Sequence, residues 1–200
     1  INGSSIDYKP PPGTSQVIYV FTATTCRAST KTIESFRLTI DGTVITATQS
    51  TWGDVDTYGN EHVFTFVIDV GSVTTDDIAN GKLSSWNSLK TLTFQAYEYN
   101  SSAYQIHWHR VQYFETSSGS TINDFVVKPQ LMITAIGRKS DTTFLNSFFN
   151  ERKGQVLETL SGTCDGRTIE VDSGTYTLAN ITTGTSVDGT TYVDFPGSSI

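Results

Sequence analysis

Two histidines, His107 and His109, flank Trp108 in a stretch that reads "YQIHWHRVQYF". On a strand, alternate residues share a face and lie about 7 Å apart, a spacing that suits two zinc ligands. A third ligand would have to come from elsewhere, and His62 and Glu98 are the candidates. Histidines on a strand are also ordinary cross-strand partners, and no H-E-x-x-H or cysteine-rich set accompanies these two. We therefore predict no metal site and no cofactor.

Two pairs of acids could do general acid and base chemistry: Asp54 with Asp56, and Asp76 with Asp77. A glycosidase needs two carboxyl groups roughly 5 to 9 Å apart across a cleft, and these pairs lie in polar segments typical of loops. Solvated loop acids or a structural calcium site are the alternatives. The sequence contains neither the G-x-S-x-G motif of hydrolases nor a phosphate-binding G-x-x-x-x-G-K-[ST] loop. We predict that the protein is not an enzyme.

Aromatic side chains are plentiful, at 12% of the residues. Sugar rings stack on exposed aromatic faces, so aromatic residues in polar segments are candidates for a glycan-binding patch. Trp52, Tyr58, Trp86 and Tyr104 are the residues we single out, and Trp52 and Tyr58 lie in the polar stretch "STWGDVDTYGNE". The alternative is that these rings belong to the core, since β-sandwiches bury many aromatics.

The bulk composition excludes several classes of partner. The net charge of −7 disfavours nucleic acid, because binding phosphates requires clustered lysine and arginine. No apolar run is long enough to span a bilayer, and "INGSSIDYK" does not resemble a signal peptide.

Cys26 and Cys164 could form one disulfide or remain two buried thiols, and the sequence leaves both open.

We expect strands to position all these residues, because the residue alternation typical of β-strands recurs along most of the chain. "SQVIYVFTAT" predicts a well-buried strand, because apolar residues occur at both alternating sets of positions. "EHVFTFVIDV" predicts another strand, with Val63, Thr65, Val67 and Asp69 on one face and Phe64, Phe66, Ile68 and Val70 on the other. "ESFRLTIDGTVITATQS" predicts a hairpin, with Asp41 and Gly42 in a turn that needs positive φ at both positions. "KTLTFQAYEY", "YQIHWHRVQYF" and "FVVKPQLMITAIG" predict further strands, and one helical turn is expected near 76–80.

The chain divides into three parts at the sequence level. Residues 1–137 are predicted to form an all-β, antiparallel β-sandwich of jelly-roll type, because seven or eight strands are expected in residues 15–137 without a long amphipathic helix. Residues 138–154 have helix-like spacing at Phe144, Leu145, Phe148 and Phe149, and predict a short helix or linker. Residues 155–200 return to hairpins, which we expect to pack on the sandwich or on a neighbouring copy.

The letters GSSI occur twice, at Gly3–Ile6 and at Gly197–Ile200. A chance match in a chain rich in serine and glycine is one interpretation. The other is that the chain is one period of a tandem array or a permuted copy, a fragment whose last strand is completed by a neighbouring module.

Several stretches resemble a family of marine viral proteins, from large DNA viruses of algae and from marine phages. They are "GSSIDYKPPPGTSQVIYVF", "SFRLTIDGTVIT", "WNSLKTLTFQAYEYNSSAYQIHWHR" and "PQLMITAIG", and they cover most of residues 3–137. The resemblance implies a jelly-roll β-sandwich located in the virion or its fibres, and it implies no catalytic residues. This chain departs from the family in order, since the segment 153–200 normally precedes the proline-rich one.

These observations predict a viral structural protein at the virion surface, in a fibre or associated with the capsid. It would associate with itself or with other virion proteins, with no nucleic acid and no membrane insertion, and could attach to a cell-surface glycan. The alternative is a carbohydrate-binding module of a secreted bacterial protein, which would be a monomer with a shallow aromatic platform.

Overall fold

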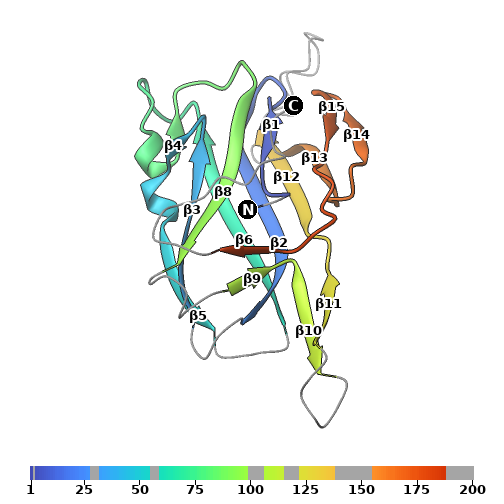
Figure 1. Cartoon of the computed structure of the whole chain (residues 1–200). Coiled ribbons are helices and arrows are strands. Elements are labelled where there is room, and N and C mark those ends of the chain that lie inside the picture. Colours follow the sequence, from blue (N-terminus) through green and yellow to red (C-terminus); the bar gives the residue numbers. More distant parts are fainter. Residues whose placement is uncertain are drawn as a thin grey trace.

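The structure is a computed structural model that describes residues 1, 3–27, 32–54, 59–98, 106–114, 122–137 and 155–187. Strands dominate these residues, and they form two main sheets that face one another (Figure 1). The predicted all-β sandwich is therefore confirmed. The helix or linker expected at 138–154 lies outside the described residues, as do residues 188–200.

The first sheet has five strands. Four run in the order β1 (Ile6–Tyr8), β8 (Lys90–Glu98), β3 (Thr32–Ile40) and β4 (Thr43–Val44), and β5 (Ser50–Asp54) pairs with the other part of β3. The predicted hairpin is present, because Asp41 and Gly42 have φ values of 48° and 75° between β3 and β4. Asp41 also fixes the sheet edge, since its carboxylate accepts the amide of Thr91 at 2.9 Å and forms an ion pair with Lys90 at 2.9 Å.

The second sheet has seven strands. Its main path is β13 (Gln155–Thr163), β12 (Gln130–Gly137), β2 (Thr14–Arg27), β6 (Asn60–Val70) and β7 (Lys82–Leu83). β9 (Ile106–Trp108) joins the end of β2, and β16 (Thr185–Val187) pairs with β9. The pairing of β6 with β7 is parallel, whereas the other described ladders are antiparallel.

Two hairpins and two short 3₁₀ helices complete the described elements. β10 (Arg110–Phe114) and β11 (Ile122–Val126) form a ribbon that projects from the sandwich, and β14 (Thr168–Val171) pairs with β15 (Gly174–Thr177) (Figure 1). The helices are η1 (Thr46–Thr48) and η2 (Ile78–Asn80), and η2 lies at the predicted helical turn. Neither of these described helices has the length that a bilayer-spanning segment requires.

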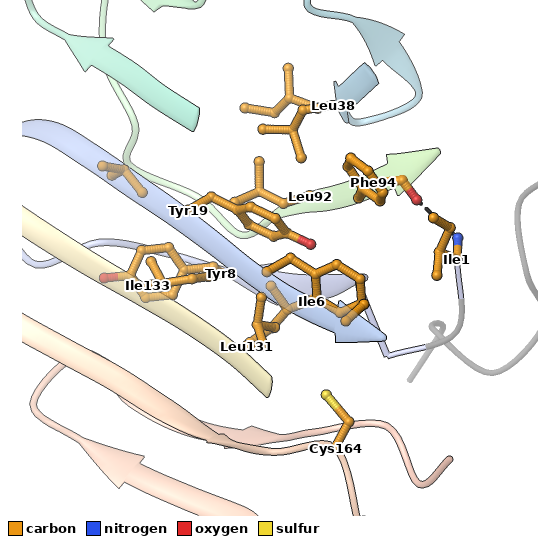
Figure 2. Packing of buried hydrophobic residues seen from close by; sticks show 14 of the residues in the cluster. Ile1, Ile6, Tyr8, Tyr19, Leu38, Leu92, Phe94, Leu131, Ile133 and Cys164 are labelled. Carbon is orange, nitrogen blue, oxygen red and sulfur yellow. Dashed lines mark hydrogen bonds between the residues drawn. The ribbon is translucent and has the colours of Figure 1, made fainter. Parts of the chain in front are cut away.

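The core lies between the two sheets and is rich in aromatic rings. Tyr19 and Phe21 of β2 are fully buried in the core. Tyr19 lies beside Leu92 of the opposite sheet (Figure 2), and the ring of Phe21 lies 5.8 Å from that of Phe94 of β8. Burying each such side chain contributes about 1.5 to 3 kcal/mol to the free energy of folding. The intervening residues of β2, Ile18 and Val20, are only partly buried because they face the other way.

The segment after residue 154 belongs to the same sandwich in this structure. β13 pairs with β12 along its whole length, from Gln130 opposite Thr163 to Gly137 opposite Gln155. The β14–β15 hairpin then turns back toward β1, where the ring of Tyr176 lies 5.4 Å from that of Tyr8. β13 and β16 thus extend the seven-stranded sheet of their own chain, and β14 and β15 form a separate two-stranded sheet.

Candidate functional site: the outer face of the seven-stranded sheet

Of the four predicted glycan-binding residues, the structure describes Trp86 and the backbone of Trp52. Trp86 is 4% exposed, its indole N–H donates to the carbonyl of Tyr8 at 3.2 Å, and its ring meets that of Tyr8 edge-on. Little of the Trp86 ring is therefore open to solvent, and its contact with a glycan stays a prediction. Trp52 lies in β5 with its backbone opposite Glu34. Tyr58 and Tyr104 lie outside the described residues.

The histidine pair does not share one strand face. His109 has a φ of 61° and falls between β9 and β10, so the regular alternation ends at Trp108. Trp108 and His109 are both fully buried, whereas His107 is half-buried with its ring nitrogen 3.2 Å from the guanidinium of Arg110. Over the parts of the chain that the structure describes, no three metal-ligating side chains come together.

Three carboxylates of the described residues hold loops and side chains in place. Asp76 accepts the amide and the hydroxyl of Ser84 at 2.7 and 2.6 Å, and these bonds lower the pKa of its carboxyl group. Asp77 accepts the side-chain amide of Asn80 at 2.9 Å. Glu34 is buried and accepts the indole N–H of Trp108 at 2.7 Å. Asp56 lies outside the described residues.

Neither cysteine is half of a disulfide within the described residues, and both are buried. The thiol of Cys164 donates to the carbonyl of Gly3 at 3.2 Å. Burial, together with the nearby charge of Asp165, raises the pKa of this thiol to about 12. Of the two alternatives that the sequence left open, the structure has buried thiols.

A groove of about 490 Å³ lies between β1 and β15. Asp7 and Tyr176 are the titratable residues among those that line it. The hydroxyl of Thr91 donates to the carboxylate of Asp7, and the hydroxyl of Tyr176 donates to the carbonyl of Lys9 at 3.1 Å. Both groups therefore hold the fold together in this structure.

The most distinctive surface is the side of the seven-stranded sheet that points away from the core. The strand registers bring one set of alternating side chains side by side on this face. They are Val63, Thr65 and Val67 of β6; Ile18, Val20 and Thr22 of β2; Gln130, Met132, Thr134 and Ile136 of β12; and Val156, Thr159 and Ser161 of β13. We call these residues the outer face.

None of the outer-face residues is charged; seven of them are apolar, and the other six are threonine, serine or glutamine. Val63 is 61% exposed, Val67 49% and Val156 54%, and Met132 lies between them at 36%. The charged residues of β6 lie toward its two ends, where Glu61 is exposed and Asp69 accepts the side-chain amide of Gln16 at 2.9 Å. Contiguous exposed apolar surface with a polar rim marks contact surfaces for other proteins.

The sequence contained a signal for this face that our site prediction did not use. In "EHVFTFVIDV" the residues at both alternating sets of positions are apolar, whereas a strand with one solvated face alternates apolar with polar residues. Phe64 and Phe66 turn out to contact the core, which leaves Val63 and Val67 facing outward. The site prediction rested on aromatic residues, because their rings can stack on sugars. The side chains exposed on this face of β6 are instead those of valines.

Compared with family models, with curated proteins and with solved structures, the chain matches none of them.

Proposed function

We propose that the protein is a structural and adhesive component of a virion, and that its outer face binds a second copy of the chain. The viral setting rests on the resemblance of residues 3–137 to marine viral proteins. The self-association rests on one observation, the exposure of the apolar side chains of Val63, Val67 and Met132 on an outer face without charged residues.

Two such faces suit one another physically. Sheets stack about 10 Å apart when their facing side chains interdigitate, and branched residues such as Val67 and Ile18 leave a regular surface for that contact. Met132 is flexible enough to fill gaps. Burying apolar area contributes about 25 cal/mol for each Å² removed from water. The same patch on both copies gives a two-fold symmetric dimer.

A lysine in the outer face tests this proposal. Val67 is about half exposed, so we expect Val67→Lys to change the free energy of unfolding by about 0.5 kcal/mol or less. In the dimer the same lysine would lose its hydration, and we expect at least about tenfold weaker association. The measurement is molar mass by light scattering across a range of concentrations, for the wild type and the variant.

Leu89→Lys is the matched control, because Leu89 is 63% exposed and lies in the loop before β8, away from the outer face. We expect it to associate like the wild type. Equal association of Val67→Lys and the wild type would refute the outer face as the contact. Attachment to a glycan through Trp52, Tyr58 or Tyr104 stays a prediction, and binding to immobilised glycans is its test.

A further inference from the structure

The four residues Gly3–Ile6 occupy a site of the sandwich in which the surroundings favour a particular residue type at each position. Gly3 has a φ of +79°, and a Cβ atom there would lie 2.9 Å from Cγ of Pro129 and 3.1 Å from Sγ of Cys164. Any side chain at this position would meet both a steric clash and an unfavourable backbone conformation. The first position of the site therefore requires glycine.

The two serines are held by hydrogen bonds inside the molecule. Ser4 is fully buried, and its hydroxyl lies 2.6 Å from the carbonyl oxygen of Ile1 and 3.0 Å from that of Phe94. The hydroxyl of Tyr19 donates to the carbonyl of Ser4. The hydroxyl of Ser5 lies 2.9 Å from that of Thr93 on β8. A larger side chain or an apolar one at either position would leave buried polar groups unsatisfied.

The last position places an isoleucine in the core. Ile6 is 4% exposed and begins β1, where it stands opposite Leu92 of β8 (Figure 2). Two residues before the glycine, Ile1 is buried in the same core. The complete pattern is thus a large apolar residue, any residue, then Gly-Ser-Ser-Ile. We call the pocket that accepts it the GSSI site, formed by residues of β8 together with Pro129, Cys164 and Tyr19.

The same pattern occurs once more in the sequence. Phe195 is followed by Pro196 and then by Gly197–Ile200, so a large apolar residue again precedes the glycine by two positions. The side chains that satisfy the GSSI site are therefore present twice in each molecule. Each molecule has one such site among the described residues, and Gly3–Ile6 occupies it.

We propose that the GSSI site is a docking site for a second copy of the chain, in which Gly197–Ile200 of one molecule replaces Gly3–Ile6 of another. This inference rests on the self-assembly proposed above and names a second contact for it. Because Gly197–Ile200 and Gly3–Ile6 are identical in sequence, the exchange replaces the contacts of these four residues by equivalent ones, as in domain swapping. The contact joins different surfaces of the two copies, so it builds head-to-tail rings or open chains, whereas the outer face builds symmetric pairs.

Weakening the resident segment alone tests the exchange. Gly3→Val places a side chain against Pro129 and Cys164, while the incoming Gly197 stays unchanged. We expect a synthetic peptide of residues 191–200 to raise the melting temperature of Gly3→Val by several degrees. The same peptide with Gly197→Val is the matched control and should have no effect. Should Gly3→Val fail to fold alone, recovery of the folded circular dichroism spectrum on adding the first peptide replaces the melting temperature.

A disulfide trap shows which molecule supplies the segment. The 2.9 Å between the hydroxyls of Ser5 and Thr93 implies that cysteines at positions 199 and 93 can bond when Gly197–Ile200 occupies the site. In the Gly3→Val background, Thr93→Cys with Ser199→Cys should give chains linked into dimers and larger species on non-reducing gels. Thr93→Cys alone should not.

Two results would overturn the inference: a peptide that leaves Gly3→Val unchanged, or a trap that closes only within single chains. The peptide assay does not involve the outer face, so its failure would leave the association tested with Val67→Lys standing. Loss of that association would in turn leave the peptide result unaffected.

Discussion

At the scale of single residues, burial favours the neutral forms of one thiol and two tyrosine hydroxyls. The free energy of unfolding therefore depends on pH in the alkaline range. The pKa of Cys164 is raised to about 12, chiefly by burial, and burial also raises the pKa values of Tyr8 and Tyr19. In the unfolded chain these groups ionise at their ordinary pKa values, near 9 for the thiol. Their contribution to stability is therefore complete below about pH 9 and is lost as the pH rises toward 12.

Cys164→Ser tests this linkage, because a serine hydroxyl can keep the hydrogen bond to Gly3 but does not ionise in this range. For the wild type we expect the free energy of unfolding to fall by up to about 1.4 kcal/mol per pH unit and per group above pH 9. The variant should show a shallower decline, measured by urea denaturation between pH 8 and pH 11. Identical slopes would show that the thiol is not the group responsible.

Individual residues also show which features the local sequence can predict and which it cannot. The Asp41-Gly42 turn was predictable, because its two positive φ values are a local requirement that few residue types meet. The burial of Trp86 was not, since it depends on Tyr8, which is 78 positions away. His109 likewise leaves the strand pattern at a point that "HWHR" does not mark.

At the scale of elements, a buried carboxylate fastens the β14–β15 hairpin to the sandwich. Glu158 of β13 is 6% exposed and accepts the hydroxyl of Tyr8 at 3.0 Å, and it also accepts the hydroxyl and the amide of Ser173 at 2.6 and 2.8 Å. Tyr176 joins the network, with its hydroxyl 2.9 Å from that of Ser173. One carboxylate thus ties β1, β13 and the hairpin together.

Removing either hydroxyl should loosen this connection. We expect Tyr8→Phe and Ser173→Ala each to lower the free energy of unfolding by about 1 to 3 kcal/mol, because each leaves the buried carboxylate with one donor fewer. Since both act on Glu158, the double variant should depart from the sum of the two, as measured in a double-mutant cycle. Thr168→Ala, on the exposed side of the hairpin, is the control and should change stability by less than about 0.5 kcal/mol. Strict additivity of the two changes would contradict a shared network.

The junction of β12 with β2 depends on a glycine at its end. A Cβ atom at Gly137 would lie 2.1 Å from the carbonyl oxygen of Gly13 and 2.7 Å from Cα of Thr14, and backbone atoms there cannot move aside singly. The ladder between the two strands shifts register at this residue. We expect Gly137→Ala to lower the free energy of unfolding by roughly 3 kcal/mol in urea titrations.

Gly42→Ala is the comparison for that variant. Gly42 has a φ of +75° and open space around it, so alanine there meets only backbone strain of about 1 kcal/mol. A smaller effect at Gly137 than at Gly42 would argue against the close approach of β12 and β2.

At the scale of the whole molecule, strand alternation predicted the sandwich but did not tell which apolar side of β6 faces inward. Both sides carry apolar residues, and only the pairing with β2 and the contact of Phe64 with Phe94 of the opposite sheet decide that Phe64 packs inside and Val63 outside. Placement of the segment after residue 154 also required a non-local contact, the ladder between β13 and β12. The candidate site forms only when β6, β2, β12 and β13 pair with one another. The prediction from sequence considered individual reactive or aromatic residues, so it did not include this face.

The central claim is that the sandwich associates with other copies through surfaces it already displays. Sedimentation equilibrium of the wild-type chain, at low salt and at high salt, tests this most directly. We predict masses that rise with concentration above the 21.9 kDa of one chain and that do not fall in high salt, because the outer face has no charges to screen. A mass of 21.9 kDa at every concentration and salt level would contradict the account.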